Sequence, residues 1–238
     1  DNFLLPFASF ENELLEKAAL SVDELSKLGY DNNQIAILKN YDGQAIEDAP
    51  ELRGVFAGMT AKFFKSSAST SSLKVRVFWE WSNAPALAGD PITDLIAMRW
   101  QGTNTGGRPL NVAFNSSKSS ANVNYYTRDG EYKFNRSVDI VCDSPYDHAY
   151  AEIPVSSGEY EDGWTIYAKS GNMYVQVDRT GTDSIKEAAF VFGYGHTVIA
   201  ISPSLSLPAS FGIGFSWGTE KMVEEAIRMD NKGIITEY

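Results

Sequence analysis

Residues 199–217 read IAISPSLSLPASFGIGFSW, and mostly apolar residues alternate in this stretch with serine, proline and glycine. A repeat of two residues is typical of a β-strand, because successive side chains of a strand point to opposite faces. The stretch therefore predicts a strand unit with one continuous apolar face and one bare face of small residues. We expect the apolar face to close the core of a β-sandwich.

The apolar residues stay at odd positions along the whole stretch, and this limits how it folds. Paired residues of a hairpin point to the same face, so a two-residue loop would move the apolar residues to even positions. The stretch is therefore either one long strand bent at Pro203 or Pro208, or a hairpin whose odd-length loop contains a proline. Proline donates no ladder hydrogen bond, which favours a sheet edge or corner.

Strand patterns continue over most of the chain. Large apolar residues alternate with other residues between Leu73 and Trp81, and Asp129-Gly130 has the composition of a two-residue hairpin loop. Many short strands separated by turn residues indicate an all-β domain. We predict a mainly β fold, an antiparallel β-sandwich or flattened barrel of about ten strands. The further strand patterns cover residues 94–100, 110–114, 123–127, 132–141, 150–153, 164–168, 173–178 and 188–193.

Helix signals gather in the first quarter of the chain. Serine or aspartate at an N-cap, followed three residues later by Glu or Gln, satisfies backbone N–H groups at a helix start. Such signals predict three short helices before Asn40, and residues 50–64 resemble a fourth, weakened by two glycines. The predicted caps are Ser9, Ser21 with Glu24, and Asp31 with Gln34.

A change of pattern divides the chain into two predicted parts. Residues 65–72, reading KSSASTSS, are polar and of low complexity, as linkers often are. We therefore predict a short-helix N-terminal segment over residues 1–64, packed on or linked to a sandwich domain over residues 73–238. Apolar residues recur at helical spacing near the end, which predicts one C-terminal helix over residues 219–229.

The composition narrows the class of protein. The net charge of the 238 residues is -11 with lysine and arginine scattered, which argues against nucleic-acid binding. No apolar run approaches the length of a membrane helix, so we predict no transmembrane helix. The single Cys142 excludes an internal disulfide and is expected to be a buried thiol. The rich Ser, Thr, Asn and Tyr content is typical of exported β-rich proteins, so we expect a secreted or cell-surface protein.

The sequence offers few groups for chemistry. Asp147, His148 and His196 are the candidates for a hydrolytic site, although no Gly-x-Ser-x-Gly elbow is present. The acidic residues around His148 match no metal-binding spacing, and the glycine-rich residues 102–107 lack the lysine of a phosphate-binding loop. We therefore predict no metal site, no cofactor and no catalytic residues.

Three functions compete on these grounds. The first is a non-catalytic binding protein that presents aromatic and polar side chains to a glycan or protein partner. The second is a β-pore-forming protein that uses residues 199–217 as membrane-length strands. The third is a hydrolase that uses Asp147 with His148, or His196. For the first, the candidate ligand contacts are Trp100, Asn104, Arg108, Tyr125, Tyr126, Tyr146 and Trp164.

Overall fold

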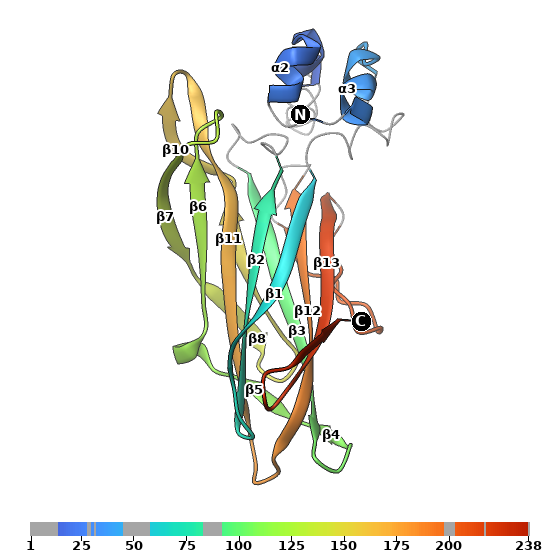
Figure 1. Cartoon of the computed structure of the whole chain (residues 1–238), viewed down its shortest axis with the longest axis vertical. Coiled ribbons are helices and arrows are strands. Elements are labelled where there is room, and N and C mark those ends of the chain that lie inside the picture. Colours follow the sequence, from blue (N-terminus) through green and yellow to red (C-terminus); the bar gives the residue numbers. More distant parts are fainter. Residues whose placement is uncertain are drawn as a thin grey trace, which may run out of the picture.

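Two antiparallel sheets of seven strands each pack face to face in the computed structural model of the chain (Figure 1). The structure describes residues 14–27, 30, 32–44, 58–82, 92–197, 203–216 and 218–237. The prediction of a mainly β, antiparallel sandwich is confirmed. The short helices lie at one end of the sandwich, and the loop that carries β4 lies at the other (Figure 1).

Sheet A has the strand order β1-β2-β11-β6-β7, and β5 and β10 also pair with β11. The strand β11 covers residues that the sequence pattern splits into two strands, and it is the longest of the sheet. The predicted hairpin at Asp129-Gly130 joins β6 to β7, but its loop is not the predicted two-residue loop, because residues 127–131 separate the two strands. The bounds are β1 (Met59–Ala68), β2 (Ser72–Trp81), β5 (Val112–Phe114), β6 (Ser120–Tyr126), β7 (Tyr132–Val138), β10 (Ser156–Glu161) and β11 (Trp164–Arg179).

Sheet B has the strand order β14-β13-β12-β3-β9-β8, with β4 paired to β3. All of its pairs are antiparallel, and β12 lies at its centre between β13 and β3. The bounds are β3 (Thr93–Asn104), β4 (Pro109–Leu110), β8 (Ile140–Ser144), β9 (His148–Pro154), β12 (Ile185–Thr197), β13 (Thr219–Asp230) and β14 (Ile235–Glu237).

The core lies between the two sheets and is rich in aromatic side chains. Trp79 and Trp81 of sheet A pack against Tyr194 of sheet B, with ring centroids 5.0 and 5.3 Å apart. Phe190 and Phe192 are fully buried beside them. Full burial of one large apolar side chain stabilises the fold by roughly 1.5 to 3 kcal/mol, so this aromatic layer fixes the relative position of the sheets.

The helical segment packs on the end of the sandwich. Residues 14–19, α2 (Val22–Lys27) and α3 (Asn32–Lys39) are helical. The predicted capping box is confirmed, because Glu24 N donates to Ser21 Oγ at 3.2 Å and Ser21 N donates to Glu24 Oε2 at 2.8 Å. Leu25 and Leu38 share a buried cluster with Tyr167 of β11. The predicted caps Ser9 and Asp31 lie outside the described residues.

The predicted C-terminal helix over residues 219–229 is wrong, because these residues belong to β13. β13 pairs with β12 from end to end. Ile227 packs into the sandwich core, while its neighbour Ala226 packs on the opposite face of the sheet. Because both faces of β13 meet apolar residues, apolar residues stand next to one another in the sequence, and this spacing imitates a helix.

The polar residues 65–72 are not a linker but the hairpin between β1 and β2. Ala68 pairs with Leu73, and Ser69 Oγ accepts hydrogen bonds from the backbone N–H groups of Ser71 and Ser72 at 3.2 and 3.0 Å. Serines favour such turns because their hydroxyl groups bond the nearby backbone. Residues 59–64 are accordingly strand rather than part of a fourth helix, and residues 50–57 lie outside the described residues. The division into two domains stays a prediction.

Residues 203–216, which we call the cover loop, form a wide hairpin on sheet B. Leu205 and Phe215 form an isolated antiparallel bridge, and Ser206 N donates to Gly214 O at 3.0 Å. Of the two predicted alternatives, the structure has the hairpin with an odd-length loop that contains Pro208. The expected closure of the core is wrong, because the apolar residues pack on the outer face of sheet B, against Ala97 and Val191.

Candidate functional site

Arg99 on the outer face of β3 holds the cover loop in place. Its Nη1 donates to the carbonyl oxygens of Pro208, Ser210 and Gly212 at 3.1 to 3.2 Å, and its Nη2 donates to Asp147 Oδ1 at 2.9 Å. The residue is only 9% exposed. The two Nη groups of this buried guanidinium donate all four bonds and fix the loop and Asp147 together, while Nε has no partner among the described residues.

Two glycines of β12 make room for the cover loop. A Cβ on Gly193 would lie 2.7 Å from Ile213 Cγ2, and one on Gly195 would lie 2.7 Å from Phe215 Cδ1. Gly193-Tyr194-Gly195 thus lets side chains of this chain, rather than a ligand, approach the backbone closely. The β12–β13 register also shifts between Tyr194 and Gly195, which is a β-bulge.

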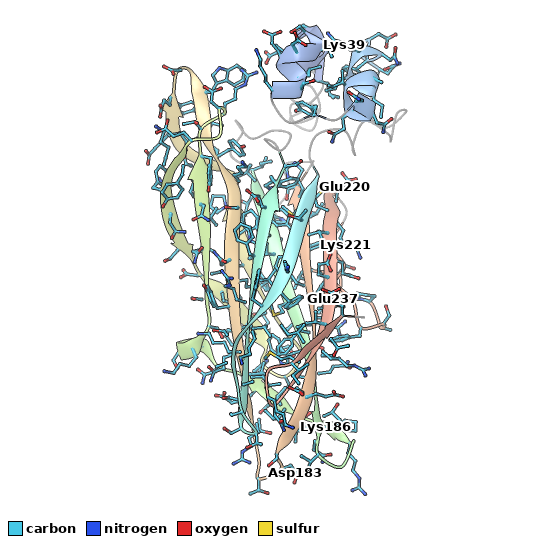
Figure 2. The ribbon with its side chains drawn as sticks, in the orientation of Figure 1. Lys39, Asp183, Lys186, Glu220, Lys221 and Glu237 are labelled. Atoms are coloured by element: carbon cyan, nitrogen blue, oxygen red, sulfur yellow. The ribbon has the colours of Figure 1, made fainter. Side chains whose placement is uncertain are left out.

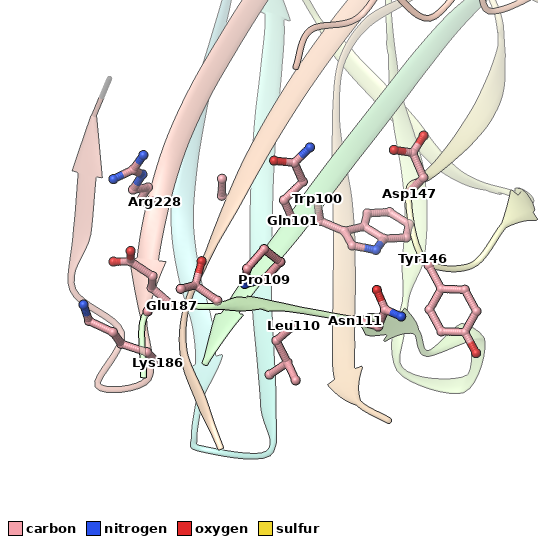
Figure 3. A pocket seen from close by; sticks show the side chains of 14 residues that line it. Trp100, Gln101, Pro109, Leu110, Asn111, Tyr146, Asp147, Lys186, Glu187 and Arg228 are labelled. Carbon is pink, nitrogen blue, oxygen red and sulfur yellow. The ribbon is translucent and has the colours of Figure 1, made fainter. Parts of the chain in front are cut away.

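Beside the cover loop, the outer face of sheet B carries an open groove of about 690 Å³, which we call the sheet B groove (Figure 3). Its floor includes Gln101 of β3, which points outward because Trp100 points into the core. Figure 3 shows Arg228 and Glu187 on one side, and Tyr146 and Asp147 on the other. Lys186, which also lines the groove, lies at the end of the sandwich opposite the helices (Figure 2).

The turn between β8 and β9 positions two of these side chains. Asp147 N donates to Ser144 O, and Asp147 O accepts from Trp100 N, both at 3.0 Å. The turn leaves the Tyr146 ring 55% exposed at the rim of the groove. Serine, proline and aspartate favour such a turn, as expected for residues 144–147.

The Asp147 carboxylate is held in its ionised form. Burial raises the pKa of this carboxyl group, but hydrogen bonds from Arg99 and His148 outweigh burial and lower the pKa below its usual value. His148 Nδ1 lies 2.8 Å from Asp147 Oδ2. A carboxylate with a lowered pKa accepts hydrogen bonds at neutral pH and is a poor proton donor.

The structure divides the seven predicted contacts between two regions. Tyr146 lines the groove, and Asn104 organises the neighbouring turn by accepting from the N–H groups of Gly106 and Arg108, both at 3.0 Å. Arg108 is exposed in that turn. The side chain of Trp100 is fully buried, stacked on Phe114, so it offers no surface for a ligand.

The other three predicted contacts lie in sheet A, away from the groove. Tyr125 is buried and donates to Pro154 O at 2.8 Å, so it belongs to the core. Tyr126 is half-buried, and Trp164 is 45% exposed with the Arg128 guanidinium 3.7 Å from its ring centroid. The seven residues therefore do not form one site.

The two histidines do not meet. His196 lies between the sheets, where its Nδ1 is 2.9 Å from both carboxylate oxygens of the buried Asp94. His148 lies next to Arg99 on the outer face of sheet B. Arg99 and Asp94 are five residues apart along β3, which corresponds to roughly 17 Å between them. Cys142 is half-buried, and burial raises the pKa of its thiol. The hypothesis of a hydrolytic site with converging histidines is therefore not supported.

Sequence patterns missed most residues of the groove. Gln101, Glu187 and Arg228 come from three strands that are far apart in the chain, and only the strand register brings them together. Arg228 lies in residues predicted as a helix, so only the positions of Gln101 and Glu187, next to the strand patterns over residues 94–100 and 188–193, were available from the sequence. The order of the strands in the sheet was not, because non-local pairing leaves no local signal.

The described part of the chain has neither a metal cluster nor a membrane-spanning helix. Within the described ranges, no group of three or more His, Cys, Asp or Glu side chains is placed to hold a metal ion. Among the same residues, no helix is long and apolar enough to cross a membrane. The pore-forming hypothesis requires long strands in this region, but residues 203–216 contain an isolated bridge instead.

Comparisons with known proteins find only distant similarities. No family model and no curated protein matches the chain. Among solved structures, a collagen-binding domain from a Staphylococcus aureus adhesin is 12% identical, with 74% of this chain and 97% of that chain covered and a TM-score of 0.30. The CBM3b module of the scaffoldin ScaA from Acetivibrio cellulolyticus is 13% identical, with 76% and 96% covered and a TM-score of 0.23.

The similar structures also include an enzyme. AvmM, which catalyses macrocyclization in alchivemycin A biosynthesis, is 14% identical, with 73% of this chain and 89% of that chain covered and a TM-score of 0.30. The three therefore combine binding modules with a catalyst. Similarities at these TM-scores do not extend to a function, which has to be argued from the residues of this chain.

Proposed function

We propose that this protein is a non-catalytic, exported or cell-surface β-sandwich protein that binds a glycan in the sheet B groove. The observation that carries the proposal is the lining of the groove, which combines the exposed Tyr146 ring with the amide of Gln101 and the ionised Asp147. A tyrosine ring offers an apolar face for the C–H groups of a sugar and a hydroxyl for a hydrogen bond.

The polar groups of the groove suit hydroxyl groups better than a single charged ligand. Gln101 both donates and accepts hydrogen bonds, Asp147 accepts, and Lys186 donates. Charges of both signs line the groove, Asp147 and Glu187 against Lys186 and Arg228, so its lining favours neither anions nor cations. Sugar hydroxyls, which donate and accept in turn, match this mixture.

The state of Asp147 favours binding over hydrolysis. A glycosidase needs one carboxylic acid with a raised pKa to protonate the leaving oxygen. The pKa of Asp147 is instead lowered by its hydrogen bonds to Arg99 and His148. The same bonds hold its position, which suits a fixed acceptor in a binding site.

A glycan array followed by calorimetry on the best neutral glycan tests the proposal. We expect Tyr146→Ala and Gln101→Ala each to weaken binding by about tenfold, because the first removes the aromatic face of the groove and the second removes the amide of its floor. Tyr160→Ala is the matched control, since Tyr160 is 65% exposed in β10 and outside the groove. A protein that binds no glycan, or whose binding is unchanged in both groove variants, would contradict the proposal.

A further inference from the structure

The outer face of sheet A carries an unusual set of side chains, distinct from the sheet B groove. Antiparallel pairing aligns Lys62, Phe78, Asn172, Asn122 and Ser137 across the five strands from β1 to β7. Neighbouring strands lie about 4.8 Å apart, so this row spans roughly 19 Å. Since Val77 and Met173 of the same strands point into the core, the row points outward. We call this the sheet A face.

Five asparagine and serine side chains of the sheet A face are joined by hydrogen bonds. Asn135 Nδ2 donates to Asn122 Oδ1 at 3.2 Å and to Asn124 Oδ1 at 2.8 Å, and Asn124 Nδ2 donates to Ser170 Oγ at 3.0 Å. Asn172 Nδ2 extends the network to Asn122 Oδ1 at 3.3 Å. The network fixes the orientation of amides that retain free donor and acceptor capacity for a ligand.

Cations of the same face are held over aromatic rings. The Arg76 guanidinium carbon lies 4.4 Å from the Phe64 ring centroid, and Arg76 Nη1 donates to Asn172 Oδ1 at 3.4 Å. Lys74 Nζ lies 5.5 Å from the ring centroid of Tyr174. A cation over a ring is positioned without being neutralised, so its charge remains available to an anion.

The charge of the sheet A face is opposite to that of the whole chain. Lys62, Lys74 and Arg76 make no ion pair with any residue that the structure describes, and Lys169 lies 4.0 Å from Glu80. The chain as a whole has a net charge of -11. A local excess of positive charge on an acidic protein attracts anions to that face and away from others.

We infer that the sheet A face binds an extended acidic polysaccharide, whose carboxylates contact Arg76, Lys62 and Lys74 and whose hydroxyls contact the asparagine network. A flat sheet face suits a chain-like ligand, because it offers a row of contacts rather than an enclosed pocket. The amides match hydroxyl groups, which the sugar–phosphate backbone of DNA lacks.

Binding of polygalacturonate, measured by calorimetry at low and high salt, tests this inference. We expect binding at low salt that weakens strongly at high salt, because exposed charge pairs are screened. Lys62→Gln/Arg76→Gln should weaken binding by about tenfold or more. Lys27→Gln/Lys232→Gln, which removes the same charge from exposed residues elsewhere, should bind as the parent protein does.

Further arms of the experiment separate the possible causes. Asn172→Ala should weaken binding without changing its salt dependence, because it removes hydrogen bonds and no charge. Tyr146→Ala should leave polygalacturonate binding unchanged, since the sheet B groove is a separate site. Unchanged thermal unfolding of each variant shows that it is folded. Equal binding of dextran, tighter binding of single-stranded DNA, or full binding by Lys62→Gln/Arg76→Gln would overturn the inference.

Discussion

The outer faces of the two sheets use arginine in opposite ways. Arg99 on sheet B is buried, and its two Nη groups donate hydrogen bonds to three carbonyl oxygens of the cover loop and to Asp147. Arg76 on sheet A lies over Phe64 and, among the residues that the structure describes, donates to Asn172 alone. The Arg99 guanidinium binds the protein's own cover loop. The Arg76 guanidinium is the one that we propose contacts a ligand. The same residue type thus serves folding on one face and recognition on the other.

Two glycines of β12 explain why the cover loop packs on the outer face of sheet B. Gly193 and Gly195 leave space on β12 into which Ile213 and Phe215 pack. On sheet A, the corresponding outward positions of β11 are filled by Asn172 and other polar or aromatic side chains that rest on the strand. A loop cannot approach that backbone closely, and no loop of the described ranges packs on the sheet A face as the cover loop packs on sheet B.

Replacing the two arginines should give the largest difference between the faces. Arg99→Leu removes the charged partner of Asp147 Oδ1 and a donor to three carbonyl oxygens of the cover loop, and we expect it to destabilise the fold by about 3 to 4 kcal/mol. Arg76→Leu should change stability by less than about 0.5 kcal/mol, as surface substitutions usually do. Urea unfolding measures both. Equal losses in the two variants would show that the faces do not differ in this way.

Alanine at two glycines should separate the core from the cover loop. A Cβ on Gly171 of β11 would lie 2.4 Å from Asn122 O and 2.5 Å from Trp79, and we expect Gly171→Ala to cost about 3 kcal/mol. A Cβ on Gly193 meets only Ile213 of the cover loop, so Gly193→Ala should cost about 1 kcal/mol.

Limited proteolysis of the same variants locates the damage. Gly193→Ala should increase the rate of cleavage within residues 203–216 and leave the cleavage rate in the rest of the chain unchanged. Gly171→Ala should increase cleavage throughout the chain. A cover loop that remains resistant in Gly193→Ala would contradict its dependence on the space over β12.

Acid should release the cover loop before it affects the sheet A face. Because the pKa of Asp147 is lowered in the folded state, its contribution to stability is complete above the unfolded pKa of about 4. The contribution is lost as the pH falls through the folded pKa. The stability difference between the parent protein and Asp147→Asn should therefore shrink below about pH 4.

Urea unfolding of both proteins at several pH values measures this smaller effect. A second carboxylate also holds the cover loop and serves as an internal control. Glu224 of β13 accepts a hydrogen bond from Ile213 N at 2.8 Å. Asp147→Asn should retain that contact and lose the charge interactions of Asp147 with Arg99 and His148. A stability difference that stays constant between neutral and acidic pH would show that Asp147 is not held ionised by Arg99.

Sequence patterns predicted the fold well wherever a local rule operates. The Asp129-Gly130 hairpin and the Ser21–Glu24 capping box depend on neighbouring residues, and both are present. The helix predicted over residues 219–229 is wrong, because apolar contacts on both faces of β13 give its residues a helix-like spacing. The cover loop kept its predicted parity, but no local signal says which face it packs against.

The candidate sites were harder to predict than the fold. Tyr146 could be singled out because it follows proline in a turn, and it does line the sheet B groove. The period-two repeat of Asn122 and Asn124 was a usable signal for the sheet A face. The contact between Asn122 and Asn172 was not predictable, since it depends on the register of β6 with β11.

The contrast between the two faces is tested most directly by the reactivity of lysines toward acetylation, with and without polygalacturonate, read by mass spectrometry. Our account predicts protection of Lys62, Lys74 and Lys169 on the sheet A face and unchanged acetylation of Lys186 and Lys221 on sheet B. Protection of Lys186 instead, or equal protection of all five lysines, would contradict it.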